Sequence, residues 1–136
     1  MTFRYKRPDS KNAISIVQAA KEEIDYTFTI EINEKSSSTI IRNIYESFRM
    51  LGDALLTHQG RITQDHVECI RELMKLNIKS ERPLGALDNL RILRHNINYY
   101  GYRPKIEEVK DALNLTKALF KPIHKVVLKE VSKQNS

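Results

Sequence analysis

The longest periodic stretch of the chain, residues 104–127, reads PKIEEVKDALNLTKALFKPIHKVV. Its apolar positions recur at alternating spacings of three and four residues, which is the repeat of one face of an α-helix. Pro104 and then Glu107 and Glu108 stand at its start, where proline and acidic side chains favour a helix. The stretch therefore predicts a long amphipathic helix, kinked at Pro122, with one buried stripe. The stripe consists of Ile106, Val109, Leu113, Thr116, Phe120, Ile123 and Val127.

The first part of the chain predicts two more helices of the same kind. Asp9 or Ser10 is a suitable cap for a helix over residues 10–32. Residues 24–32 also alternate as a strand would, but a lone strand leaves its backbone groups unsatisfied, so we expect the helix to continue. A serine within residues 33–38 caps a second helix that ends at Gly60.

Two further helices are expected between this part and residue 104. One starts at Thr63, with Asp65 in its first turn, and is broken by residues 79–83. The other spans residues 86–100 and stops at Gly101. Its apolar stripe is Ala86, Leu90, Leu93, Ile97 and Tyr100.

Five amphipathic helices joined by short connections favour an all-α fold, an antiparallel four- to five-helix bundle. A chain of 136 residues is expected to form one domain. We place that domain at residues 10–130, with basic or polar tails at residues 1–9 and 131–136. The single cysteine permits no internal disulfide, and no apolar run approaches the length of a membrane span. These features predict a cytoplasmic protein.

The net charge of +6 invites a nucleic-acid interpretation, but its distribution matters more. Residues 1–12 and 121–136 each carry four basic side chains against one acidic side chain, so generic affinity for anions is expected at the two ends. Residues 22–34 are purely acidic in their charges, whereas residues 82–105 carry five basic residues against Asp88. Specific recognition of an anion is therefore expected from residues 82–105.

Within that basic segment, the predicted fourth helix carries an unusual polar face. At about 100° per residue, its face opposite the apolar stripe contains guanidinium groups, an imidazole, an amide and phenols, and no lysine or glutamate. Such planar donors and stacking groups suit phosphate and bases. A solvated surface face is the alternative interpretation. The residues are Arg91, Arg94, His95, Asn98, Tyr99 and Tyr102.

The order of several short motifs resembles that of a HEPN domain, the higher eukaryotes and prokaryotes nucleotide-binding family. The motifs are IYESFR (44–49), Gly60, Asp65-His66, LRILRHNINYYGY (90–102) and PKIEE (104–108). The resemblance covers roughly residues 10–128. It implies a homodimer that forms a metal-independent ribonuclease site at its interface, often in a toxin paired with a nucleotidyltransferase antitoxin.

In that family, an arginine is followed at once by a polar residue and then by a histidine four to six residues further on. Arg94 and His95 match the first two positions, but Tyr99 stands where the histidine is first expected. A histidine transfers protons near neutrality, with an ordinary pKa of about 6.5, and a tyrosine does not. The candidate catalytic residues are Arg94, His95 and Tyr99, and the candidate RNA- or nucleotide-binding residues are Arg91, Arg94, Asn98, Tyr99 and Tyr102.

Two hypotheses remain open at this stage. In the first, a homodimer binds RNA or a nucleotide at a cleft around Arg94, with or without cleavage. In the second, the chain is a non-catalytic bundle that assembles with a partner protein, and its acidic first helix pairs with the fourth helix, within one chain or across a dimer.

Other reactive side chains are expected to be structural. His58 and His66 flank Gly60, but they are expected at helix ends rather than at a metal, and no cofactor is predicted. Cys69 is expected in or near the core, and His124 is expected to be exposed to solvent. Lysines recur along the last predicted helix, at 110, 117, 121 and 125. We interpret them first as a solvated stripe and second as a contact to an RNA backbone.

Overall fold

The computed structural model describes residues 4–5, 7–62 and 65–133, without the side chains of residues 4, 5 and 66. It confirms the all-α prediction, with five helices in the described part of the chain. They are α1 Ser10–Thr27, α2 Ser37–His58, α3 His66–Met74, α4 Ala86–Tyr100 and α5 Ile106–Val131. Two strands of two residues each, β1 Arg4–Tyr5 and β2 Arg61–Ile62, complete the fold.

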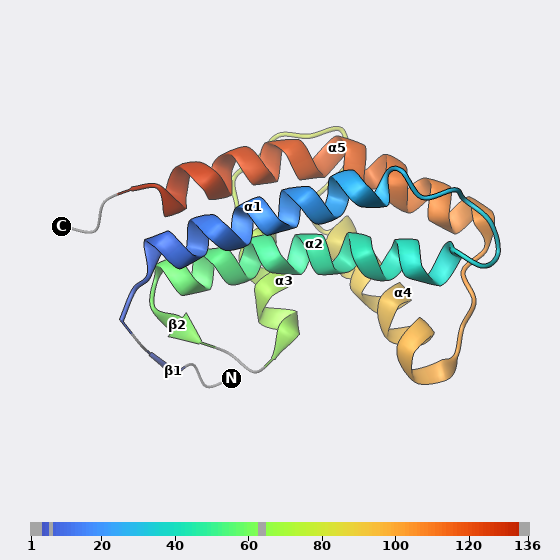
Figure 1. Cartoon of the computed structure of the whole chain (residues 1–136), viewed down its shortest axis with the longest axis horizontal. Helices are drawn as coiled ribbons and strands as arrows, with labels where there is room; N and C mark the ends of the chain where they lie inside the picture. Colours follow the sequence, from blue (N-terminus) through green and yellow to red (C-terminus); the bar gives the residue numbers. More distant parts are fainter. Residues whose placement is uncertain (1–3, 6, 63–64, 134–136) are drawn as a thin grey trace.

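Helix α2 lies at the centre of the bundle. It contacts all four other helices, with α1 and α5 along one side and α3 and α4 along the other (Figure 1). The connection between α3 and α4, residues 75–85, passes along α5, where Ser80 Oγ donates a hydrogen bond to the carbonyl of Ala118 at 3.2 Å. Among residues 4–5, 7–62 and 65–133, no helix combines the length and apolar character that crossing a membrane requires.

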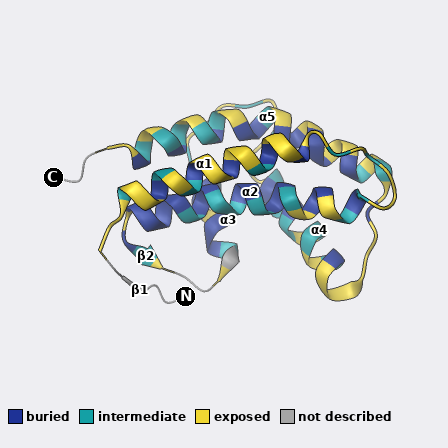
Figure 2. Ribbon diagram, viewed as in Figure 1, coloured by how far each residue is buried: buried dark blue, intermediate teal, exposed yellow. Residues whose placement is uncertain are grey.

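The core lies mainly between α1, α2 and α5. Buried residues run along the facing sides of α1, α2 and α5, while the outer sides of α1 and α5 are exposed (Figure 2). Phe48 of α2 and Phe120 of α5 meet edge to face, with ring centroids 5.4 Å apart, which is a favoured aromatic geometry. Six of the seven residues of the predicted α5 stripe are buried, and Ile106 is partly exposed.

Helices α2 and α3 approach closely because Gly52 has no side chain. A Cβ atom added at Gly52 would lie 2.0 Å from the carbonyl oxygen of Cys69. The backbone of α3 therefore lies directly against α2, and Cys69 is buried. The prediction that Cys69 is a core residue is confirmed.

Several predicted helix boundaries are wrong, and one of them is the end of α3, which lies at Met74 rather than at the break expected from residues 79–83. Helix α1 ends at Thr27 rather than near residue 32. Turn hydrogen bonds replace the helical ones there, since the amide of Thr29 donates to Tyr26 and the amide of Ile30 donates to Thr27. The chain leaves the helix so that Ile30 and Ile32 pack against the core from a loop. Helix α5 begins at Ile106, with Lys105 as its N-cap, so Pro104 precedes the helix.

The start of α3 also differs from the expectation. Asp65 caps the helix from outside, because its Oδ1 accepts a hydrogen bond from the amide of Val67 at 3.0 Å. Thr63, the predicted start, lies outside the described residues.

Part of the predicted N-terminal tail is paired with the body of the protein. Arg4 and Tyr5 lie antiparallel to Ile62 and Arg61, in the segment that follows α2. Two-residue strands leave no alternating pattern in a sequence, so this pairing had no local signal.

Candidate functional site

Helix α4 carries most of the predicted site residues, and its two halves have different surroundings. Leu87, Leu90 and Ile97 are buried. The last turn extends away from α2 (Figure 1), and Gly101 ends the helix in the left-handed conformation, with φ 63°. Tyr100, predicted on the apolar stripe, is 76 % exposed for this reason, and that prediction is wrong.

A surface pocket of about 350 Å³ opens beside α4. We call it the Arg94 pocket. Three elements line it, because α2 contributes one aromatic ring, the start of α3 contributes two residues, and α4 contributes the rest. The lining residues are Tyr45, Asp65, Val67, Arg91, Arg94, His95 and Tyr99.

Arg94 lies over the ring of Tyr45, with its guanidinium carbon 5.1 Å from the ring centroid. This is a cation–π contact, which orients the guanidinium without neutralising it. Burial raises the pKa of the Tyr45 phenol, an effect that the nearby Arg94 charge partly offsets, so the phenol stays neutral. Within the described residues, no carboxylate lies at ion-pair distance from Arg94. Its positive charge therefore remains available to a ligand.

Arg91, one turn earlier, is held differently. Its Nε lies 2.8 Å from Oδ1 of Asp88, and this hydrogen bond raises the pKa of the guanidinium. Arg91 thus enters the pocket as an oriented cation whose charge is partly compensated.

His95 and Tyr99 form an exposed aromatic pair at the pocket. Their ring centroids are 4.5 Å apart, with the planes tilted by 35°, and Tyr100 packs edge-on against His95 with a centroid distance of 5.7 Å. Tyr99 is 68 % exposed. An exposed aromatic ring of this kind offers a face on which a base can stack.

Two predicted binding residues do not line the pocket. The side chain of Asn98 accepts a hydrogen bond from Nε of Arg42, on α2, at 2.8 Å. The Tyr102 hydroxyl donates to the carboxylate of Glu108, on α5, and this bond raises the pKa of the phenol. Both side chains therefore tie the end of α4 to its neighbours.

Sequence reasoning missed Tyr45, Asp65 and Val67 as lining residues. Tyr45 belongs to the IYESFR motif, and Asp65 was assigned to the start of a helix. Nothing local in the sequence indicates that either approaches Arg94, because tertiary packing across α2, α3 and α4 brings them together.

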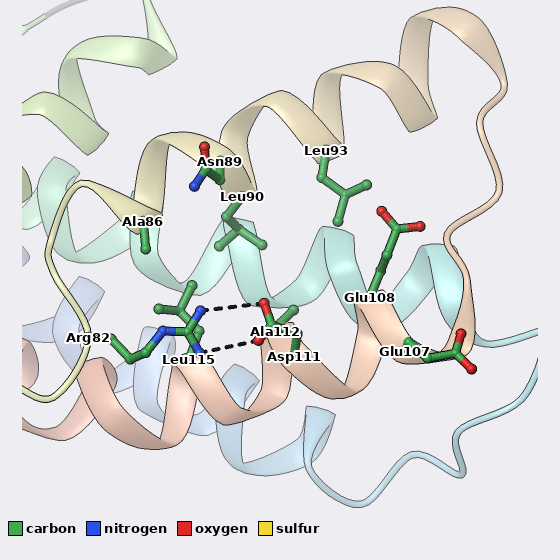
Figure 3. Close-up of a pocket in the computed structure, with 10 residues that line it drawn as sticks. All are labelled: Arg82, Ala86, Asn89, Leu90, Leu93, Glu107, Glu108, Asp111, Ala112 and Leu115. Atoms are coloured by element: carbon green, nitrogen blue, oxygen red, sulfur yellow. Dashed lines mark hydrogen bonds and ion pairs between the residues drawn. The ribbon is translucent and has the colours of Figure 1, made fainter.

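A second hollow, about 340 Å³ in volume, separates α4 from α5 (Figure 3). Leu90 and Leu93 face α5 across it, and Arg82 makes two hydrogen bonds to Asp111 at 3.3 and 3.4 Å. The carboxylate of Glu108 accepts hydrogen bonds from the Tyr102 hydroxyl and from the backbone amide of Lys105. These polar groups satisfy one another, in contrast with the uncompensated Arg94.

The remaining predicted residues have structural surroundings. His58 is buried, and its Nδ1 lies 2.8 Å from the hydroxyl oxygen of Ser10. Burial raises the pKa of the Cys69 thiol to about 11, so Cys69 is a poor nucleophile. His124, expected in solvent, is half-buried and stacked on Phe120, which corrects that prediction. The side chain of His66 lies outside the description.

The structure also bears on metal binding and on the pairing of acidic and basic helices. Among the described residues, no group of three or more histidine, cysteine or carboxylate side chains is arranged to hold a metal. Within that same part of the chain, no ion pair joins α1 to α4, and Asp25 of α1 pairs with Lys21 at 2.6 Å instead. The version of the second hypothesis in which these helices pair within one chain is therefore wrong.

Comparisons with family models, with curated proteins and with solved structures each find no match. The resemblance to HEPN domains therefore stays a prediction.

Proposed function

We propose that the protein binds RNA or a nucleotide in the Arg94 pocket. The observation that carries this proposal is the guanidinium of Arg94, which is oriented by Tyr45 and has no carboxylate partner in the described structure. An oriented, uncompensated guanidinium beside exposed aromatic rings is suited to a phosphate that is attached to a base.

The other lining residues favour a nucleotide over inorganic phosphate. Arg94 and Arg91 neutralise the phosphate, and the ring pair of His95 and Tyr99 receives the base. Asp65, a carboxylate at the same pocket, disfavours a second anion beside the bound phosphate. The volume of about 350 Å³ lies in the range of small-ligand sites.

A second copy of the chain is the proposed partner at this face. Ile92 is 44 % exposed, and with His95 and Tyr99 it forms one stripe of α4 at helical spacing. Covering that stripe with the same stripe of a second copy brings two Arg94 pockets together. This arrangement agrees with the homodimer that the HEPN resemblance implies.

We propose binding as the primary activity and cleavage as a dependent one. An imidazole is an ordinary general acid or base for RNA cleavage, and His95 supplies an imidazole to this pocket. Metal-independent cleavage, if His95 supports it, survives a chelator and disappears in His95→Ala. A role as the toxin-like partner of a nucleotidyltransferase antitoxin belongs to this proposal through the same resemblance.

The exposed stripe of α4 also supports the second hypothesis, a non-catalytic bundle that assembles with another protein. Apolar and aromatic residues exposed in a row are typical of interaction surfaces. The two functions differ in the role of Arg94, since a bundle of that kind has no need of an uncompensated guanidinium in a pocket.

Filter retention of labelled single-stranded RNA tests the proposal. We expect Arg94→Ala to weaken binding about tenfold, because a charge-assisted contact to phosphate is lost. Arg103→Ala removes the same charge from the same basic segment outside the pocket, and we expect it to retain nearly full affinity. An equal loss in both variants, or no loss in either, contradicts the proposal.

Two further measurements accompany the retention assay. The slope of affinity against salt concentration should become shallower in Arg94→Ala, as the loss of one phosphate contact requires. Chromatographic mass tests the shared site, because a strict monomer contradicts the dimeric version.

A further inference from the structure

A cavity of about 440 Å³ lies between α1 and α5, on the other side of α2 from α3 and α4. We call it the Lys117 pocket. Three residues of α1 and five of α5 line it, together with Phe28, which directly follows α1. The lining residues are Lys21, Ile24, Asp25, Phe28, Thr116, Lys117, Phe120, Lys121 and His124.

The floor of the Lys117 pocket is apolar. Ile24 and Phe120 are buried, and Phe28 is 40 % exposed at its edge. Thr116 is also buried, and its hydroxyl is satisfied because it donates to the carbonyl of Ala112 at 2.7 Å. A flat apolar ligand body that covers Phe28 removes exposed aromatic surface from water.

His124 extends this floor. Its ring stacks on Phe120, with centroids 6.0 Å apart and planes inclined by 26°. Burial, and secondarily the charge of Lys21, lower the pKa of His124, so the imidazole is neutral at neutral pH. A neutral stacked ring adds planar surface to the pocket rather than charge.

The rim, in contrast, is positive. Lys21 is compensated by Asp25 at 2.6 Å. The ammonium of Lys117 lies 6.0 Å from the ring centroid of Phe28, which is the outer limit of a cation–π contact. In the part of the chain that the structure describes, neither Lys117 nor Lys121 forms an ion pair with a carboxylate.

We infer that the Lys117 pocket binds a small organic anion with a planar apolar body, such as an aromatic carboxylate or sulfonate. The body lies against Phe28, Phe120 and His124, and the acidic group reaches Lys117 and Lys121. Two uncompensated ammonium groups above an apolar floor match the two ends of such a molecule. The inference is independent of the proposed function, since the two pockets share no residue.

The probe for the test is 8-anilinonaphthalene-1-sulfonate, a sulfonate on a planar naphthalene ring that fluoresces when it leaves water. We expect the folded protein to bind one probe molecule per chain, more weakly at high salt because the lysines are exposed. The double variant Lys117→Gln/Lys121→Gln should bind roughly fivefold more weakly. The unlabelled competitor 2-naphthoate should displace the probe.

The matched control is Lys125→Gln/Lys129→Gln. It removes two charges with the same four-residue spacing from exposed positions of α5 outside the pocket. We expect it to bind the probe as the wild type does. Equal affinity in the two double variants, or an equal loss in both, overturns the inference.

Two further arms separate this pocket from the proposed RNA site. Arg94→Ala should retain probe binding whether or not RNA binding survives in that variant. If Arg94→Ala loses the probe, the probe occupies the Arg94 pocket and the inference fails. Displacement of the probe by single-stranded RNA also overturns it, because the lysines then belong to a nucleic-acid surface.

Discussion

Helices α2 and α4 both repeat apolar residues at helical spacing, yet they are buried to very different extents. Most of the 22 residues of α2 are buried. Of the 15 residues of α4, only Leu87, Leu90 and Ile97 are buried. The same periodicity therefore occurs in a central helix and in a projecting one, and the projecting helix carries the candidate site.

The largest loss of stability is expected from a substitution in the buried face of α2. Phe48 is fully buried and packs against Phe120, so Phe48→Ala leaves a cavity that the bundle fills poorly. We expect a loss of about 4 kcal/mol in the free energy of unfolding, measured by urea titration.

Tyr100→Ala is the matched truncation on α4. Since Tyr100 is mostly exposed, we expect a change within about 0.5 kcal/mol. Similar losses in Phe48→Ala and Tyr100→Ala would show that α4 is as buried as α2 in solution, as it would be in a tight dimer.

Substitutions at two glycines, one in α2 and one at the start of α4, compare how closely the two helices are packed. Gly52→Ala places a methyl group against the backbone of Cys69, and the two helices must separate to admit it. We expect a loss of about 3 kcal/mol in thermal or urea unfolding.

Gly85→Ala provides the control at the start of α4. An added Cβ there meets nothing within 4 Å, so we expect little change in stability. A tolerated Gly52→Ala would contradict the close approach of α2 and α3.

The smallest effect is expected at the end of α4. Gly101 has φ 63°, a conformation that is strained for alanine. Gly101→Ala should cost about 1 kcal/mol in the free energy of unfolding and leave the core intact. Near-ultraviolet circular dichroism should report changed surroundings of the tyrosines near Gly101, whereas an unchanged stability would contradict the left-handed cap.

The sequence predicts the helices well because burial on one face repeats along each helix. The stripe that ends in Ile123 and Val127 is buried as the spacing requires. Tyr100 is an exception. It lies in the last turn of α4, which extends away from α2 (Figure 1). The predicted end of α1 is wrong because Ile30 and Ile32 pack against the core from a loop rather than from a helix.

The candidate site is predicted only in part, for a related reason. Periodicity places Arg91, Arg94, His95 and Tyr99 on one face, and the structure brings them to one pocket. Periodicity does not indicate that Asn98 on the same helix pairs with Arg42 of α2, because the two residues lie 56 positions apart in the chain. Pairings of this kind depend on how the helices are packed, which no single stretch of sequence records.

The close contact at Gly52 has a further consequence for handling the protein. Cys69, whose backbone meets Gly52, carries the one thiol of the chain, and burial keeps that thiol protonated. Only a thiolate attacks a disulfide or an oxidant at a useful rate. The folded protein should therefore tolerate purification in air without a reducing agent, and a dimer formed through α4 should run as a single chain in non-reducing denaturing electrophoresis.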